Sequence, residues 1–224
     1  VAVGDFNGDD FADLAIGEPG AGSPAGARSG AVSVLLGGEA GLAPDTAISF
    51  SQDTDGVGDD AEVDDRFGSS LAAGDFNGDG ADELAVGTPG ESIGTVQGAG
   101  LVQVFAGSSE GLVLVDRSFH EDTPGVKNVV EPWDRFGSAL AVGDFDADGA
   151  DDLAIGVPNE AAGVKTASGS LHVLRGSADG LPATGSTRFS QAKKALSERP
   201  EPGDDFGAAL VAGQFNSARG DDLA

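Results

Sequence analysis

"GDFNGDGADELAVG", residues 74–87, joins a cluster of acidic and amide side chains directly to an apolar run. Close copies stand at 4–17 ("GDFNGDDFADLAIG") and 143–156 ("GDFDADGADDLAIG"), and a degenerate copy, "GQFNSARGDDLA", stands at 213–224. The acidic loops begin at residues 5, 75, 144 and 214, which is a period of 69 or 70 residues. The chain is therefore an internal repeat, and the repeated unit decides the fold.

The sequence between the acidic loops also repeats, and it indicates short strands. A Phe-Gly pair precedes each later loop, as in "RFGSSLAAGDF" at 66–76. A glycine- and proline-rich loop follows the apolar run, and then an alternating segment such as "GAVSVLLGG" at 30–38, a turn and a fourth apolar segment. Alternation with a period of two between glycines is typical of strands, and no segment keeps a helical period. Four antiparallel strands per repeat predict the blade of an all-β propeller.

We expect residues 1–224 to form a single partial β-propeller. The predicted blades are 1–52, which lacks its N-terminal part, 63–122, 132–192, and 203–224, which lacks its C-terminal part. A closed ring needs about four to eight blades, more than this sequence supplies. We interpret the chain as a piece of a longer propeller, with self-association of such chains as the alternative.

The composition limits the classes of partner. The chain has 224 residues, 37 of them glycine, no cysteine and a formal net charge of −26. Such a negative surface argues against nucleic acid and anionic membranes as partners. Without cysteine there is no disulfide and no thiolate metal site. No apolar run approaches the roughly 20 residues that span a bilayer, so we expect no direct membrane insertion.

The acidic loops have the oxygen pattern of calcium sites. Side-chain oxygens fall at positions 1, 3, 5 and 9 of each loop, and position 7 can add its backbone carbonyl. Calcium takes six to eight hard oxygen ligands, whereas magnesium seldom uses an all-protein cage. We predict about three Ca²⁺ ions, one per intact loop. The predicted ligands are Asp5, Asn7, Asp9, Phe11 and Asp13, then Asp75, Asn77, Asp79, Ala81 and Glu83, then Asp144, Asp146, Asp148, Ala150 and Asp152.

Position 6 of the loop requires a positive φ, which suits Gly80 and Gly149, and which Asp10 tolerates in the first loop. The loops are not EF-hands, because an apolar residue stands at position 12 in place of glutamate. In the fourth loop Gln214 and Ala218 replace two acids, so we expect no calcium there.

The order of "FG", "GDFNGDGADELAVG" and "G-x-P" resembles FG-GAP repeats, which form the blades of the integrin α-subunit propeller, and the chain is similar to bacterial FG-GAP proteins. The resemblance covers the whole chain. It implies a propeller that commonly has seven blades, with calcium loops between the first and second strands of each blade. It also implies that partners bind the opposite face. The lost acids at 214 and 218, the aspartate at 10 and the small number of repeats depart from that pattern.

We expect a non-catalytic, calcium-stabilised binding or adhesion module that recognises a protein or glycan. Calcium loops with millimolar or somewhat tighter affinity fill outside cells, which favours a secreted or cell-surface location. The recognition loops would be 17–30, 87–98 and 156–169, with 51–66, 120–135 and 190–205. They contain His120 and the only tryptophan, Trp133, whose alternative role is packing against a neighbouring blade beside Phe136. The alternative function is the propeller domain of a secreted enzyme, a polysaccharide lyase or hydrolase with its activity elsewhere.

Two short motifs are interpreted as structural. "GSSEG" at 107–111 matches the nucleophile elbow of hydrolases, but its counterparts in the other repeats are plain hairpin turns, so Ser109 is not expected to be catalytic. The tripeptide "RGD" at 219–221 lies inside the degenerate loop, where Asp221 has the equivalents Ala12, Asp82 and Asp151. The low number of histidines and the absence of tyrosine and cysteine favour binding over catalysis.

Overall fold

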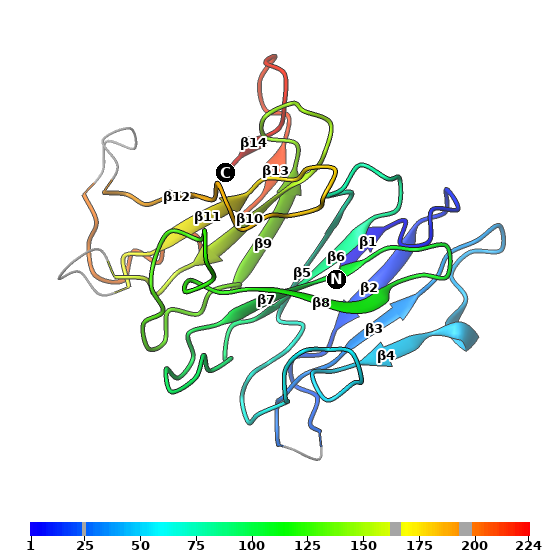
Figure 1. The fold of residues 1–224 in the computed structure, drawn as a ribbon, viewed down its shortest axis with the longest axis horizontal. Helices are drawn as coiled ribbons and strands as arrows, with labels where there is room; N and C mark the ends of the chain where they lie inside the picture. Colours follow the sequence, from blue (N-terminus) through cyan, green and yellow to red (C-terminus); the bar gives the residue numbers. More distant parts are fainter. Residues whose placement is uncertain (24–25, 162–166, 193–198) are drawn as a thin grey trace.

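A computed structural model describes residues 1–23, 26–161, 167–192 and 199–224, and it is built from antiparallel sheets (Figure 1). The first sheet contains β1 (Ala2–Gly4), β2 (Asp13–Gly17), β3 (Val32–Leu35) and β4 (Ile48–Phe50), with a single 3₁₀ turn at Pro44–Thr46. The second contains β5 (Ser70–Gly74), β6 (Glu83–Thr88), β7 (Leu101–Ala106) and β8 (Val113–Phe119). The third contains β9 (Ala139–Gly143), β10 (Asp152–Val157), β11 (Ser170–Leu174) and β12 (Thr187–Phe189), and the last pairs β13 (Ala212–Gly213) with β14 (Asp222–Leu223).

The strands of each sheet follow one another in sequence order, from β1 to β4, β5 to β8 and β9 to β12. The first strands of successive sheets, β1, β5, β9 and β13, lie next to one another, so the sheets are arranged like the blades of a fan (Figure 1). This arrangement confirms the predicted all-β propeller with partial blades. The four sheets lie within the ranges 1–52, 63–122, 132–192 and 203–224 that the sequence predicts for the blades.

The Phe-Gly pair brings neighbouring blades into backbone contact. Gly68 has a φ of +82°, and a Cβ added to Gly17 in β2 would lie only 2.0 Å from the carbonyl oxygen of Gly68. A side chain at Gly17 would therefore push the two blades apart, because real Cβ atoms do not approach a carbonyl so closely. The same close approach recurs between Gly87 and Gly137, and between Gly156 and Gly207.

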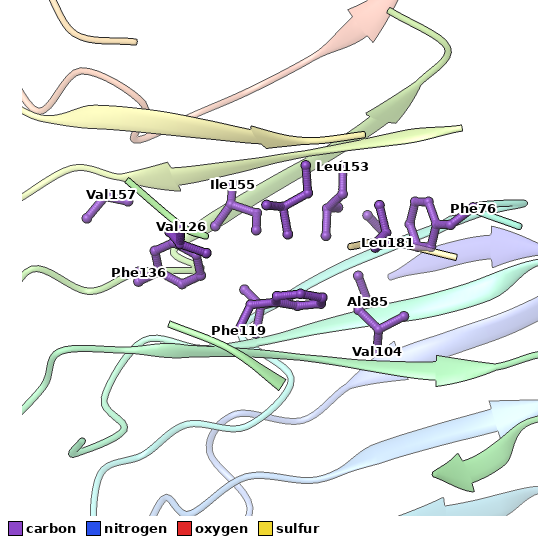
Figure 2. Packing of buried hydrophobic residues seen from close by; sticks show 13 residues of the cluster. Phe76, Ala85, Val104, Phe119, Val126, Phe136, Leu153, Ile155, Val157 and Leu181 are labelled. Carbon is purple, nitrogen blue, oxygen red and sulfur yellow. The ribbon is translucent and has the colours of Figure 1, made fainter. Parts of the chain in front are cut away.

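The hydrophobic core lies between the blades. Between the first two blades, the buried ring of Phe67 packs edge-on against Phe50 and Phe105, with ring centroids 5.9 and 6.3 Å apart. Between the second and third blades, Phe119 and Phe136 face the side chains of β10 (Figure 2). Both faces of the middle strands are covered, which explains why β6 and β10 are apolar runs with little alternation.

Among the residues that the structure describes, no helix has the length and the apolar character that crossing a membrane requires.

Candidate metal centre

Each intact acidic loop connects the first two strands of a blade and curls around its first aspartate. In the first loop the carboxylate of Asp5 accepts hydrogen bonds from the backbone N–H groups of Asp9 (3.1 Å) and Asp10 (2.7 Å). The carboxylate of Asp9 in turn accepts the N–H of Phe11 (2.9 Å). These bonds use the acids to shape the loop, so that alternate side chains are held toward its inside.

The other two intact loops repeat this curl. The carboxylate of Asp75 accepts the N–H groups of Gly78 (2.6 Å) and Gly80 (2.9 Å), and that of Asp144 accepts the N–H of Gly149 (3.1 Å). Position 6 has a positive φ in all three loops, as predicted: +69° at Asp10, +93° at Gly80 and +98° at Gly149. The sequence therefore sets the loop conformation through its first acid and its sixth residue.

The acids at position 9 have a structural role that the sequence does not reveal. Asp13, Glu83 and Asp152 begin the second strand of their blades and are almost fully buried. The two carboxylate oxygens of Asp13 accept the N–H groups of Phe6 (2.8 Å) and Gly37 (2.6 Å). Burial raises the pKa of Asp152 to about 6 and that of Glu83 to about 7. These acids anchor the loop to the sheet.

The structure brings three carboxylates together in the third loop. Asp144, Asp146 and Asp152 each offer an oxygen, and these oxygens lie within 4.8 Å of one another. The guanidinium of Arg175 contacts the carboxylate of Asp146. Three like charges at this separation repel one another strongly, and the arginine reduces that repulsion.

In the first two loops an asparagine occupies position 3, and no three-acid group of this kind forms among their residues, all of which the structure describes. The amide of Asn7 donates to Asp9 (2.9 Å), and the amide of Asn77 donates to Glu83 (2.7 Å). In each of the three loops, one carboxylate thus contacts a side-chain N–H group. This group belongs to asparagine in the first two loops and to arginine in the third.

The donor chemistry of the three loops fits Ca²⁺. Every group at positions 1, 3, 5 and 9 carries a hard oxygen, which is the ligand type that calcium prefers. The position 7 carbonyls of Phe11, Ala81 and Ala150 accept no hydrogen bond from the described residues, so they are available as further ligands.

The fourth loop differs in both side chains and backbone. The amide of Asn216 donates to Asp222 (2.6 Å), the one acid of the predicted set that this loop keeps. The positive φ has moved from position 6, which is Arg219, to Gly220 at position 7 (+86°). The loop therefore has neither the donor set nor the curl of the other three.

Acids at position 8 connect neighbouring loops, which sequence reasoning missed. Asp82 donates its N–H to the carbonyl oxygen of Asp5 (2.8 Å) and accepts the N–H of Asp5 on its carboxylate (2.8 Å). Asp151 holds Asp75 in the same way, and Asp221 holds Asp144. We call these contacts the interblade stitches. The aspartate of the "RGD" tripeptide is one of them, and the recurrence of aspartate at position 8 was the available signal.

The opposite ends of the strands carry the loops predicted for recognition. Trp133 is 55% exposed and has a φ of +70°, and one face of its ring covers Gly98 of the neighbouring blade. The other predicted residue, His120, is partly buried, and burial lowers its pKa. A cavity of about 710 Å³ is lined by Trp133 together with Arg66 and Arg135. Parts of loops 17–30, 156–169 and 190–205 lie outside the described residues.

The fold and the loops define a β-propeller protein assembled from repeated acidic-loop blades. A sequence model of the FG-GAP repeat matches residues 1–35, 67–105 and 136–174, half of the chain. The chain belongs to the FG-GAP repeat family, and its likeness to integrin α-subunits supports an integrin-like propeller, as the sequence predicted.

Relatives of the chain include both enzymes and integrins. Phosphatidylinositol-glycan-specific phospholipase D of Rattus norvegicus is 41% identical over 115 residues, covering 51% of this chain and 14% of the relative. Integrin alpha-8 of Homo sapiens is 32% identical over 187 residues, covering 81% of this chain and 15% of the relative. The chain therefore spans about a seventh of these relatives.

A crystal structure of the exotype rhamnogalacturonan lyase YesX is similar in fold, with a TM-score of 0.51 and 15% sequence identity. The likeness covers 99% of this chain and 37% of the lyase, and it supports the propeller fold alone.

Proposed function

We propose that this chain is a calcium-stabilised, non-catalytic extracellular binding module. In this proposal it recognises a protein or glycan partner through the face opposite the acidic loops. The observation that carries the proposal is the recurrence of one hard-oxygen donor set in three loops, joined in series by the interblade stitches. A module that needs calcium to hold its blades in register suits a role as a rigid scaffold for its loops.

In this proposal calcium stabilises the folded form of each loop. A ligand that binds only the folded chain stabilises it by mass action. Sites with affinities of about 10⁻⁴–10⁻³ M are filled outside cells and empty in the cytosol, so calcium dependence supports a secreted or cell-surface location.

The cavity at Trp133 supports recognition on the opposite face. A bulky residue such as tryptophan is strained in the left-handed region. The same repeat position in the neighbouring blades is occupied by Asp64 and Gly203, which tolerate a positive φ. The exposed ring and the two arginines in one cavity offer an amphipathic and a charged surface to a partner. Strained residues cluster at functional sites, which is a reason to place recognition here.

The phospholipase D relatives favour a second candidate function. The chain would then be the propeller domain of a secreted enzyme, a lyase or hydrolase, with its activity in another part of the full-length protein. In either case the ring would be closed by additional blades or by self-association.

The test is a glycan array combined with a pull-down of protein partners, each with calcium and with chelator. We expect calcium-dependent binding that Trp133→Ala abolishes. Ser109→Ala, in the turn between β7 and β8, is the matched control and should bind normally. Binding that persists in Trp133→Ala would contradict the assigned face, and turnover of a polysaccharide by this chain would favour the enzyme instead.

A further inference from the structure

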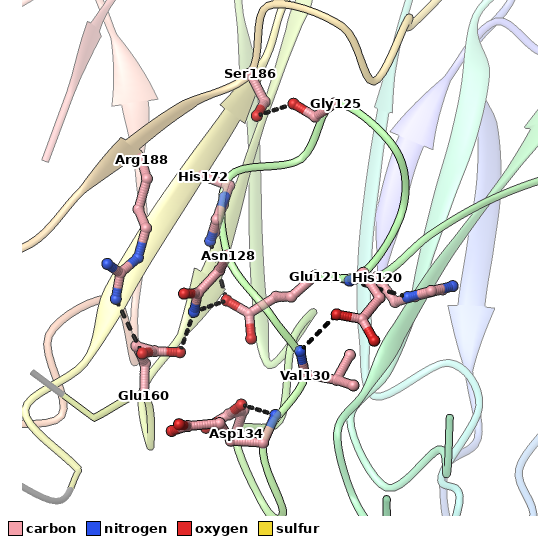
Figure 3. Close-up of polar contacts among 12 residues, drawn as sticks. His120, Glu121, Gly125, Asn128, Val130, Asp134, Glu160, His172, Ser186 and Arg188 are labelled. Carbon is pink, nitrogen blue, oxygen red and sulfur yellow. Dashed lines mark hydrogen bonds and ion pairs between the residues drawn. The ribbon is translucent and has the colours of Figure 1, made fainter. Parts of the chain in front are cut away.

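Three buried acids converge between the second and third blades, far from the acidic loops. Glu121 follows β8, Asp134 precedes β9 and Glu160 follows β10, and each is at most 3% exposed. One oxygen from each carboxylate lies within 4.8 Å of the other two. Figure 3 shows the three side chains pointing toward one another from separate segments. We call them the interblade acids.

The donors around the interblade acids offset only part of their charge. The amide of Asn128 donates to both Glu121 (3.0 Å) and Glu160 (2.6 Å), and the guanidinium of Arg188 pairs with Glu160 (3.0 Å). The imidazole Nε2 of His172 lies 3.1 Å from Oε1 of Glu121. Among the described residues, one arginine, paired with Glu160, thus accompanies three buried carboxylates.

A buried oxygen in this group has no N–H or hydroxyl donor. Oε2 of Glu121 accepts no such hydrogen bond from the described residues, although the side chain is only 1% exposed. The carboxyl groups of Glu121 and Asp134 lie within hydrogen-bond reach of each other, and a bond between them requires a shared proton. Figure 3 shows this oxygen directed toward Asp134, while the other oxygen receives Asn128 and His172. A buried carboxylate oxygen without a donor is costly, and buried charges in proteins are either paired or bound to metal.

The same feature recurs one repeat earlier, between the first and second blades. Gln52, Asp65 and Glu91 stand 69 residues before Glu121, Asp134 and Glu160. Asp65, Glu91 and Glu62 form another group of carboxylates within 4.8 Å. The amide of Gln52 donates to Glu91 (2.5 Å), which leaves its own buried Oε1 without a described donor. Gln52 and Glu121, at equivalent positions of two repeats, therefore each have one buried side-chain oxygen without an N–H or hydroxyl donor among the described residues.

We propose that a divalent cation, calcium by the chemistry of its oxygen donors, binds between the second and third blades at Glu121, Asp134 and Glu160. An equivalent site lies between the first and second blades at Gln52, Asp65 and Glu91. The cation supplies the positive charge that the group lacks and a partner for the oxygen without a donor. These sites connect the blades at the face opposite the acidic loops.

The position of the only tryptophan gives a selective test. Trp133 adjoins Asp134, and the chain has no tyrosine. Terbium replaces calcium at oxygen sites, and its emission under tryptophan excitation reports only ions close to the ring. The acidic loops stand at the other end of the strands, about 17 Å away for a five-residue strand such as β9. We expect tryptophan-sensitised terbium emission that added calcium suppresses.

Variants separate these sites from the loops. Asp134→Asn keeps an acceptor for the N–H of Glu131 but removes the charge. We expect it to lose one bound calcium per chain, counted by mass spectrometry after dialysis, and to weaken the sensitised emission. Part of the emission should remain, because Trp133 also lines a cavity with Glu62, beside the equivalent site. Asp148→Asn, in an acidic loop, should lose one calcium and keep the emission. Trp133→Phe should lose the emission and keep the calcium.

If Asp134→Asn does not fold, Glu121→Gln takes its place, because it keeps the oxygen that receives Asn128. Sensitised emission that is unchanged in either folded variant overturns the proposal. So does an absence of emission in the parent chain whose loops are loaded, since the acids would then share a proton in place of a cation. Neither result bears on the loops, whose calcium is counted separately.

Discussion

Removing calcium should lower the free energy of unfolding by several kilocalories per mole. Loops of this kind at the tighter end of the extracellular range bind with a dissociation constant of about 10⁻⁴ M. At a free calcium concentration about a hundred times higher, each occupied site stabilises the folded chain by about 2.7 kcal/mol. The three loops that keep the donor set therefore contribute about 8 kcal/mol together.

This loss should be plain in thermal unfolding. For a chain of this size, 1 kcal/mol corresponds to about 2–4 °C in Tm, so chelation should lower the Tm by at least about 15 °C. Scanning calorimetry at a series of calcium concentrations measures the shift. The Tm should rise with the logarithm of calcium concentration once the sites begin to fill, because stabilisation follows mass action.

Single-loop variants provide the internal check. Asp148→Asn should reduce the calcium-dependent stability that the loops contribute by about a third, since it disables one loop of three. Asp45→Asn removes an exposed acid of the 3₁₀ turn and should leave the calcium response intact. A Tm that is the same with calcium and with chelator would refute the reasoning, and so would an equal loss in both variants.

Three further predictions concern the blades themselves. Phe67→Ala should cost about 3–5 kcal/mol in urea unfolding, because it empties a fully buried site between two blades, whereas Phe215→Ala, which is 62% exposed, should cost less than about 1 kcal/mol. Gly87→Ala should cost about 1–3 kcal/mol or more, since the new Cβ would lie 2.2 Å from the carbonyl oxygen of Gly137, and an unchanged unfolding midpoint would contradict that contact. In chelator, stability should fall as the pH rises from about 4.5 to about 8. Burial raises the pKa of Glu91 to about 8 in the folded chain, so the folded state holds its proton more tightly than the unfolded state does. Urea midpoints across that range would test the sign, and a rise with pH would show it to be wrong.

The fold was predictable because the same local sequence pattern occurs in three copies. Alternation marks the strands, and the glycines that bound the alternating segments mark their ends. The loop curl was predictable too, since Gly80 and Gly149 sit where a positive φ is needed and Asp10 tolerates it. These features depend on neighbours in the sequence, so one copy explains the others.

The interactions between blades were not predictable, because their partners are a whole repeat away. Asp82 bonds the backbone of Asp5, 77 residues earlier, and the recurrence of aspartate at position 8 does not identify that partner. Within one blade, the contact between Arg175 and Asp146 spans 29 residues, and the local pattern does not show it either. The buried state of Glu121 is equally hidden, since a glutamate after a strand is usually exposed.

The position of the acids explains why so negative a chain can fold as stacked blades. The middle strands are covered on both faces by apolar side chains, so the buried acids between blades lie at the strand ends. At one end they accept backbone N–H groups and link loop to loop. At the other end Asn128 and Arg188 satisfy part of the group formed by Glu121, Asp134 and Glu160. The alignment of neighbouring blades therefore depends on the groups that neutralise or hydrogen-bond the acids at both ends of the apolar core. For this reason we expect cations to affect the stability of the fold.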